Sequence, residues 1–305
     1  MLELKIGGQA VIEGVMMRAP HSLSIAVRNP QGQIVVKNEK LKLLSDSWPI
    51  FSKPLLRGTV ALIQSMIMGI RALNYSANVA LEGETDKKGQ QQEIGGVTLA
   101  ATLLFALGVS ICLFFLLPLF ITNFLKGFLT FINQSSLFFN LVDGIIRVCI
   151  FLIYLGVVSL MKDISRIFEY HGAEHKAVSN YESGQELNPA NAKKFSTAHP
   201  RCGTSFLLLV MVISILVFSL VPKETDLAMK ALYRIIFLPL ISGLSFEVTR
   251  LGTRKNAGPI WGVFMAPGLW LQKLTAKEPN EEQIEVAIRA LQEALALEKE
   301  SARVG

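Results

Sequence analysis

The chain has 305 residues, of which 51% are hydrophobic and 18% charged, and its mean hydropathy is +0.42. This composition argues against two soluble domains and excludes a disordered chain and a collagen-like fibre. Three cysteines in so long a chain also exclude a disulfide-stapled secreted scaffold. The net charge of +6 is spread without a dense basic run, so we expect the lipid bilayer as partner and no nucleic acid.

Residues 1–53 are predicted to be a cytoplasmic region that contains β structure. Apolar and polar residues alternate on both sides of Asn29-Pro30-Gln31-Gly32, where Pro at the second and Gly at the fourth position favour a type I turn. The pattern predicts a hairpin of 22–28 and 33–37. A lone hairpin is marginal in water, so we expect it to pair with a strand at 11–17 or to pack on later cytoplasmic segments.

A glycine-rich stretch precedes this hairpin, with three glycines in the eight residues from Gly7 to Gly14. They permit the backbone to approach either a ligand or another strand closely. We favour a tightly packed turn over a binding loop. Glu13 and Arg18 are charged residues in an otherwise apolar segment, which makes both of them candidate additional site residues.

Residues 54–95 are predicted to form an amphipathic helix, 54–81, followed by a polar linker, 82–95. The polar side chains of the helix recur at helical spacing and so lie close to one stripe. Such a helix lies in the headgroup plane or packs along the bundle, and we favour packing. The stripe contains Arg57, Gln64, Arg71, Asn74 and Asn78.

Residues 96–249 are predicted to be a transmembrane bundle, because four apolar stretches are long enough to cross about 30 Å of hydrocarbon. Two stretches carry charges near their ends, namely Arg147, Arg234 and Glu247. These side chains either reach the headgroups or form buried ion pairs, the arginines with Asp143 or Glu247. The predicted spans are 96–121, 143–161, 204–221 and 231–249.

The positive charges predict the orientation of these spans. Lys and Arg number 11 in 1–95, 1 in 122–142, 6 in 162–203, 2 in 222–230 and 8 in 250–305. Cytoplasmic loops carry the excess of Lys and Arg. We therefore expect a multi-pass protein of the plasma membrane with both termini in the cytoplasm.

Residues 250–305 are predicted to be a cytoplasmic segment that ends in a soluble helix. Asn280 is a favourable N-cap, and Glu281 and Glu282 suit the first helical turn. Apolar residues recur at helical spacing from Ile284 to Leu295, which predicts a helix that docks on this protein or on a partner. The fold class is thus mainly α: a polytopic membrane helix bundle of about four spans, with a small N-terminal β-hairpin region and a C-terminal soluble helix.

The strongest chemical signal lies in residues 162–203. His171 and His175 are four residues apart, so a helix places both imidazoles on one face, where they can grip one cation. With Glu174 they spell H-x-x-E-H, the inverted zincin pattern, in which the histidines bind zinc and the glutamate is the general base.

Two further donors follow in the same segment, His199 and Cys202. With the first two histidines they make four ligands of a closed structural site, or three of them plus a water make an open catalytic site. An inverted zincin takes a distant glutamate as third ligand, and Glu247 is the candidate. The alternative is that the histidines bind headgroups or backbone and that Cys202 is a small buried residue.

Four motifs resemble the YqhQ-like family of bacterial membrane proteins of unknown function, which are described as predicted metal-dependent enzymes. The resemblance covers nearly the whole chain and implies a metal site at the histidine motifs without identifying a substrate. The motifs are Gly7–Arg18, Glu169–Lys176, His199–Ser205 and Pro267–Gln272.

Two functions remain open at this stage. The first is a metal-dependent membrane enzyme, a hydrolase at the cytoplasmic face, in which His171, His175 and either His199 or Cys202 hold Zn²⁺ or another divalent transition metal and Glu174 is the base. The second is a non-enzymatic assembly or scaffold factor, in which the same side chains form a structural metal site. In that case the hairpin and the C-terminal helix dock a membrane or cytoplasmic partner protein.

Overall fold

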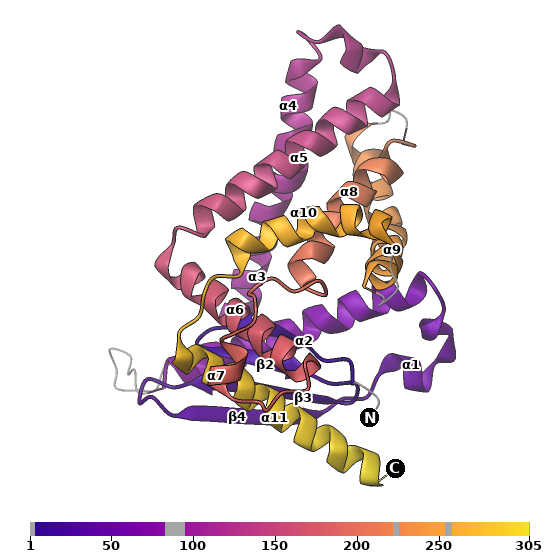
Figure 1. The fold of residues 1–305 in the computed structure, drawn as a ribbon. Helices are drawn as coiled ribbons and strands as arrows, with labels where there is room; N and C mark the ends of the chain where they lie inside the picture. The colour runs from indigo at the N-terminus through magenta and orange to yellow at the C-terminus, as the bar shows by residue number, and fades with distance from the viewer. Residues whose placement is uncertain (1–3, 83–94, 222–225, 254–257, 305) are drawn as a thin grey trace.

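The computed structural model describes residues 4–82, 95–221, 226–253 and 258–304. The molecule is elongated, with a layered region around a β-sheet at one end and long apolar helices at the other (Figure 1). Both chain termini lie at the sheet end, and the turn between residues 125 and 136 lies at the far end. The predicted linker 82–95 falls almost wholly on residues 83–94, outside the described part of the chain.

The N-terminal residues form an antiparallel sheet in sequential order, with strands β1 (Gly7–Val11), β2 (Gly14–Arg18), β3 (Ser22–Arg28) and β4 (Ile34–Lys40). The pairing of β3 with β4 confirms the predicted hairpin. At its turn the Gly32 amide donates to the Asn29 carbonyl oxygen at 2.9 Å. Gly32 has a φ of +83°, a left-handed conformation that glycine adopts without steric cost.

The stretch expected as one strand at 11–17 is instead a second hairpin. Strands β1 and β2 pair in a register that sets Val11 opposite Gly14, so only Ile12 and Glu13 form the turn. Glu13, the second residue of this turn, has a positive φ of 52°, which is uncommon for residues other than glycine. The prediction that the 22–37 hairpin pairs with a further strand is confirmed, because β2 pairs with β3. The predicted bounds 11–17 were wrong because the turn at Ile12 and Glu13 contains neither Gly nor Pro and so gave no turn signal.

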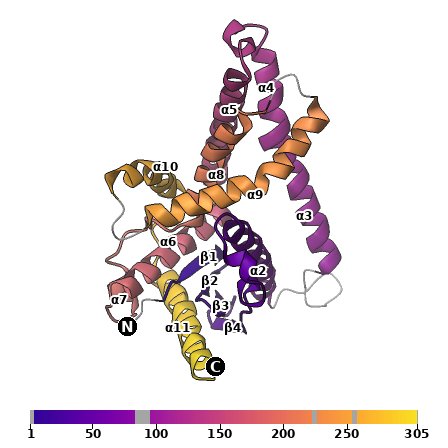
Figure 2. The same ribbon diagram turned by 90° about the vertical axis from the view of Figure 1, so that its right-hand side faces the viewer.

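Helices cover both faces of the sheet, and the strand residues alternate between them (Figure 2). On one face α2 (Leu56–Ala80) packs through Ala72 and Val79 against a set that includes Met16 and Ile25. The side chains of successive strand residues point to opposite faces. The neighbours of Met16 in β2, Val15 and Met17, therefore pack on the other face.

That second face is covered by α6 (Lys162–Glu182) and α11 (Glu281–Val304). The predicted C-terminal helix is thereby confirmed as α11, and it docks on this chain. Its first turn is closed by a reciprocal cap, in which the Gln283 amide donates to Asn280 Oδ1 and the Asn280 amide donates to Gln283 Oε1, both at 2.9 Å.

The long helices α3, α4, α5, α8, α9 and α10 form the apolar part of the molecule, whereas the short helix α7 packs on α6 and α11 and α1 lies at the sheet end (Figure 1). A continuous helix runs through α3, the π-helical segment η2 and α4, and α5 returns antiparallel beside it (Figure 1). The bounds are α1 (Leu44–Ser47), η1 (Pro49–Ser52), α3 (Gly96–Ile111), η2 (Cys112–Leu116), α4 (Leu117–Leu125), η3 (Thr130–Asn133), α5 (Ser136–Val158), α7 (Pro189–Ala192), α8 (Gly203–Phe218), α9 (Leu227–Gly252) and α10 (Pro259–Thr275).

Among the described residues, four helices are long and apolar enough to cross a membrane: Leu56–Ala80, Gly96–Leu125, Ser136–Val158 and Leu232–Gly252. Three of them match predicted spans. The predicted span 204–221 is the shorter helix α8, whose sixteen residues extend about 24 Å, less than the roughly 30 Å of hydrocarbon. Helix α2 takes its place by length and composition, although one of its faces packs on the sheet.

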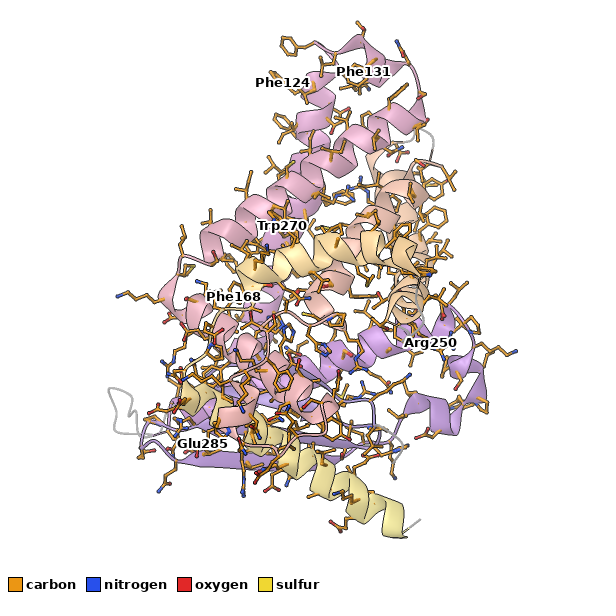
Figure 3. The ribbon with its side chains drawn as sticks, viewed as in Figure 1. Phe124, Phe131, Phe168, Arg250, Trp270 and Glu285 are labelled. Atoms are coloured by element: carbon orange, nitrogen blue, oxygen red, sulfur yellow. The ribbon has the colours of Figure 1, made fainter. Side chains whose placement is uncertain are left out.

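The apolar helices expose large hydrophobic side chains along their length, from Phe105 in α3 to Ile153 in α5. Soluble monomers rarely expose such continuous apolar surface. Phe124 and Phe131 lie at the far tip of this bundle, whereas Glu285 lies in the sheet layers at the other end (Figure 3). The distribution is compatible with a membrane protein.

Two arginines that the sequence placed near span ends lie inside the bundle. Helix α5 begins seven residues earlier than the predicted span, which makes Arg147 its central residue. Both Arg147, at 2.5 Å, and Arg234 of α9, at 3.0 Å, donate to Asp143 Oδ2. Of the two alternatives, the structure therefore has the buried ion pair rather than arginines that reach for headgroups.

Candidate metal centre

The predicted histidine motif lies on α6, and its two histidines share one face of that helix. The ring centroids of His171 and His175 are 4.4 Å apart. Helix α6 follows α5 after three residues, 159–161, so the motif is held near the boundary between the apolar bundle and the sheet layers.

Cys202 joins these histidines from the beginning of α8, where it is the N-cap residue. Its thiol is buried and lies 3.2 Å from His171 Nε2. The ligand atoms of His171, His175 and Cys202 all lie within 4.8 Å of one another. The fold therefore brings together two donors from α6 and one from the start of α8, although His175 and Cys202 are 27 residues apart in the sequence.

Backbone carbonyl groups orient both imidazoles. His171 Nδ1 lies 2.7 Å from the Thr275 carbonyl oxygen, and His175 Nδ1 contacts the Thr197 carbonyl oxygen. A carbonyl oxygen only accepts, so each Nδ1 carries the proton and each Nε2 keeps its lone pair. This is the arrangement that metal-binding histidines use, because the outer hydrogen bond fixes the tautomer and the ring.

One donor separation is close to that expected around a tetrahedral zinc ion. Zinc bonds of about 2.0–2.1 Å to nitrogen and 2.3 Å to sulfur place neighbouring donors roughly 3.3–3.6 Å apart. The 3.2 Å between His171 Nε2 and Cys202 Sγ is close to this value. Two imidazoles and a thiolate also form a donor set of the kind that zinc prefers. The residues present thus fit a metal ion with one coordination position left over.

Glu174 lies beside the three donors. Its side chain is nearly buried, with the residue 6% exposed, and its Oε2 is 3.6 Å from His175 Nε2. Strand β1 covers it closely: a Cβ on Gly8 would stand 2.6 Å from Glu174 Cγ. Gly8 of the N-terminal motif therefore permits the close approach of β1 to the Glu174 side chain.

Gly172, between the two histidines, lets another segment approach the same helix. A Cβ at this position would lie 1.9 Å from the carbonyl oxygen of Lys277. The chain that follows α10 passes here, and the Lys277 amide donates to the Phe168 carbonyl oxygen at 2.9 Å. The same segment carries the Thr275 carbonyl that orients His171.

His199 is a neighbour of the cluster but does not join its three donors. Its Nδ1 accepts from the Arg201 amide, so its protonated Nε2 donates to Glu182, both at 3.3 Å. Burial lowers the pKa of His199, and the nearby Glu174 carboxylate offsets part of that effect. Both ring nitrogens are engaged, and the structure therefore assigns His199 to the support of the site.

The other three candidates lie elsewhere. Glu247 forms a bidentate ion pair with Arg57 of α2, away from the histidines. Glu13 pairs with Arg166 of α6 and accepts from the Tyr170 hydroxyl at 3.3 Å; burial and this carboxylate raise the pKa of Tyr170. Arg18, at the end of β2, is half-buried, and desolvation lowers its pKa.

Sequence reasoning missed the residues that hold the cluster together. Buried Gln272 of α10 accepts from the His199 amide at 2.7 Å and donates to the His199 carbonyl oxygen at 2.9 Å and to Ser205 Oγ at 2.8 Å. The sequence signal that could have identified Gln272 was its amide side chain within a mostly apolar helical stretch. Thr197 and Thr275 act through their backbone carbonyl groups, so their role does not depend on the side chain and cannot be predicted from the residue type.

Comparison with known proteins supports the predicted resemblance. Residues 53–297 match the family described as "Protein of unknown function (DUF1385)". The chain is 33% identical over 303 residues to "Uncharacterized protein YqhQ" of Bacillus subtilis (strain 168), an alignment that covers 96% of this chain and 92% of that protein. No solved structure matches this chain. By the extent of both matches, the chain belongs to the YqhQ-like family of proteins of unknown function, DUF1385.

Proposed function

We propose that this protein is a metal-dependent hydrolase that acts at the cytoplasmic face of the plasma membrane. The observation that carries the proposal is the convergence of the ligand atoms of His171, His175 and Cys202 within 4.8 Å, beside the buried carboxylate of Glu174. Perturbed or buried acids next to a donor cluster are typical of catalytic sites.

Each residue has a role in the proposed reaction. His171, His175 and Cys202 hold a zinc ion, which when bound supplies Lewis acidity and makes a water molecule acidic near neutral pH. Glu174 is the general base that accepts the proton of the attacking water. The carbonyl groups of Thr275 and Thr197 keep both imidazoles oriented, and β1 shields the carboxylate from bulk water through Gly8.

The cytoplasmic assignment rests on charge and shape together. The segments richest in Lys and Arg are the N-terminal region, 162–203 and the C-terminal region, and their elements β1 to β4, α6 and α11 lie together at the sheet end. The loop between α4 and α5 carries a single lysine at the opposite end. By the positive-inside rule the sheet end faces the cytoplasm, and the substrate is then a lipid headgroup or a peptide segment at that surface.

A structural metal site is the second candidate, and one observation favours it. The three donors belong to α6, which is packed in the sheet layers, and to the first residues of the apolar helix α8. A metal ion there would pin the sheet layers to the bundle. The protein would then be an assembly or scaffold factor whose sheet end docks a partner.

Glu174→Gln separates the two functions. In an enzyme it removes the base but none of the three donors, so we expect full metal content, an unchanged unfolding midpoint and loss of function. In a scaffold the variant is nearly silent. The measurements are metal content by elemental analysis, thermal unfolding in detergent and complementation of a strain that lacks the gene.

Two controls accompany this variant. His175→Ala removes a donor, and we expect it to lower metal content and the unfolding midpoint under either function. Glu285→Gln is the matched carboxylate control, because Glu285 is an exposed residue of α11 that pairs with Arg28 and lies outside the donor group. Wild-type protein that binds no stoichiometric transition metal would refute both functions of the site.

A further inference from the structure

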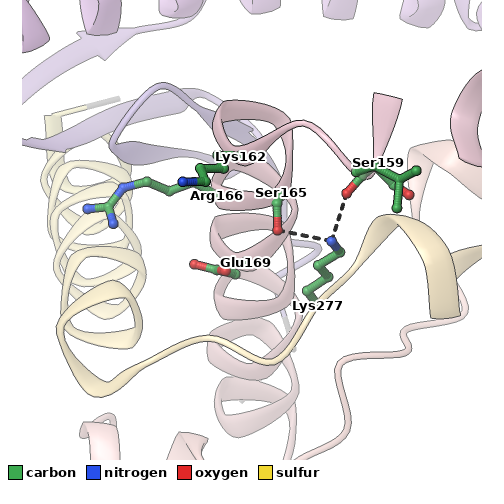
Figure 4. Close-up of a pocket in the computed structure, with 7 residues that line it drawn as sticks. Ser159, Lys162, Ser165, Arg166, Glu169 and Lys277 are labelled. Atoms are coloured by element: carbon green, nitrogen blue, oxygen red, sulfur yellow. Dashed lines mark hydrogen bonds between the residues drawn. The ribbon is translucent and has the colours of Figure 1, made fainter. Parts of the chain in front are cut away.

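A second polar site lies on α6, in a cavity of about 480 Å³ at the junction with α5. The segment that joins α5 to α6, the first two turns of α6 and the segment after α10 form its walls (Figure 4). It is lined by Ser159, Leu160, Lys162, Ser165, Arg166, Glu169 and Lys277.

This cavity is separate from the metal cluster. At roughly 100° per residue along an α-helix, positions 162, 166 and 169 lie on the opposite side of α6 from His171 and His175. The segment from Thr275 to Lys277 runs between the two, because Thr275 holds His171 and Lys277 lines the cavity. A ligand in the cavity therefore does not compete for the donors.

The lining is rich in positive charge. Lys162, Arg166 and Lys277 contribute three cations to the lining and Glu169 one carboxylate, which already accepts from Gln283 at 2.8 Å. The guanidinium of Arg166 is paired with Glu13, so the two lysines supply the positive charge that remains for a ligand. Lys277 Nζ donates to the Ser159 carbonyl oxygen and to Ser165 Oγ, both at 2.9 Å, and keeps one of its three N–H bonds for a ligand (Figure 4). Lys162 has no partner among the described residues.

The cavity also lies where an apolar helix ends. Val157 is 60% exposed, Leu160 83% and Met161 55%, so uncovered apolar side chains lead from the surface of α5 directly to the cationic lining. A ligand with a phosphate and hydrocarbon chains would place its phosphate on the cationic lining and its chains on the apolar surface of α5. Basic groups just inside a membrane span attract anionic lipids in this way.

We propose that this cavity binds the headgroup of an anionic phospholipid. Lys162 and the spare N–H of Lys277 receive the phosphate, Ser165 and Arg166 complete the polar wall, and the acyl chains run along α5 beside Val157 and Leu160. The lipid holds the boundary between α5 and α6 at the membrane surface. This proposal is independent of the hydrolase and of the metal.

The test uses the full-length protein in detergent, titrated with phosphatidylglycerol or phosphatidylcholine and followed by native mass spectrometry. We expect one tightly retained phosphatidylglycerol, bound at least tenfold more tightly than phosphatidylcholine. Lys162→Glu should weaken retention on the order of tenfold, because each basic residue near the headgroups contributes substantially. The variant should fold, since an acidic residue suits the first turn of α6.

Lys299→Glu on α11 is the matched charge reversal, because Lys299 is exposed and lies outside the cavity. It should leave retention unchanged. An excess of inorganic phosphate distinguishes the two sources of a phosphate group: it should not displace the lipid. Equal retention of phosphatidylcholine, displacement by inorganic phosphate, or equal loss in both charge reversals would each overturn the proposal.

Discussion

Gly172 shows how one missing side chain permits the candidate site to form. The carbonyl oxygen of Lys277 occupies the space where a Cβ would stand, at 1.9 Å. Since that oxygen belongs to the backbone, no rotamer change can relieve the clash. The segment that carries Thr275, and with it the hydrogen bond that orients His171, depends on this glycine.

Gly172→Ala should therefore weaken both the fold and the metal site. We expect a loss of about 1–3 kcal/mol in the free energy of unfolding, as for other overpacked positions, together with lower metal content. Gly203→Ala is the control, because nothing lies within 4 Å of a Cβ there, although it follows Cys202 directly. Thermal unfolding and elemental analysis measure the two effects; unchanged metal content in Gly172→Ala would contradict the proposed coupling.

The histidine and cysteine donors could be predicted at the residue scale because their identity and spacing express their chemistry. Two imidazoles one helical turn apart need only a helix to converge. Glu247 and His199 have the same kinds of donor atom, yet Arg57 occupies the first and a local hydrogen-bond pair engages the second. Such competition between hydrogen-bond partners depends on three-dimensional packing, which cannot be predicted from the spacing of residues in the sequence.

At the scale of elements, Asp143 of α5 neutralises one of two arginines inside the apolar bundle. Its side chain is 3% exposed, and its Oδ2 accepts from both Arg147 and Arg234. The guanidinium of Arg234 also lies 4.4 Å from the ring centroid of Phe115. Charges in such surroundings are costly unless they are paired.

Asp143→Asn should destabilise the contact between α5 and α9 by about 3–5 kcal/mol, because it leaves two buried cations without a countercharge. The unfolding midpoint in detergent measures this loss. Glu281→Gln breaks the exposed ion pair with Lys193 and serves as the control, for which we expect almost no shift. A midpoint for Asp143→Asn equal to that of the wild type would show that the arginines are solvated from elsewhere.

Helices and strands could be predicted from the sequence where residues close to each other in the chain determine them. The hairpin turn at Asn29–Gly32 and the capped helix after Asn280 are confirmed because turn and cap residues act on their own neighbours. Helix α2 was harder, since its apolar surface suits a sheet and a bilayer equally well. Helix α10 went unpredicted, since we placed the whole of 250–305 outside the bundle and Pro267 stands inside the helix.

At the scale of the whole molecule, α11 completes the layered end. It lies against β2, β3 and α6, with Leu291 fully buried in their common core. The N-terminal strands and the C-terminal helix thus form one unit with α6 from the middle of the chain, and α6 carries the candidate site where this unit meets the apolar bundle.

Leu291→Ala should lower the free energy of unfolding by about 2–5 kcal/mol through the cavity it leaves. Hydrogen exchange of the β2 and β3 amides should accelerate, because these strands lose their cover. Ile50→Ala removes an exposed side chain of η1, and we expect its effect to stay within about 0.5 kcal/mol. Protected strand amides in Leu291→Ala would mean that α6 alone suffices to cover the sheet.

The contact between the sheet and α11 also has a consequence for biosynthesis. The His21 amide donates to the Glu298 carboxylate, and these residues are 277 positions apart. At about 5–20 residues per second, the ribosome needs on the order of 10–50 s between the two. During that interval this face of the newborn sheet lacks its cover by α11 while the apolar helices emerge, so this end of the molecule can close only after Glu298 has been synthesised.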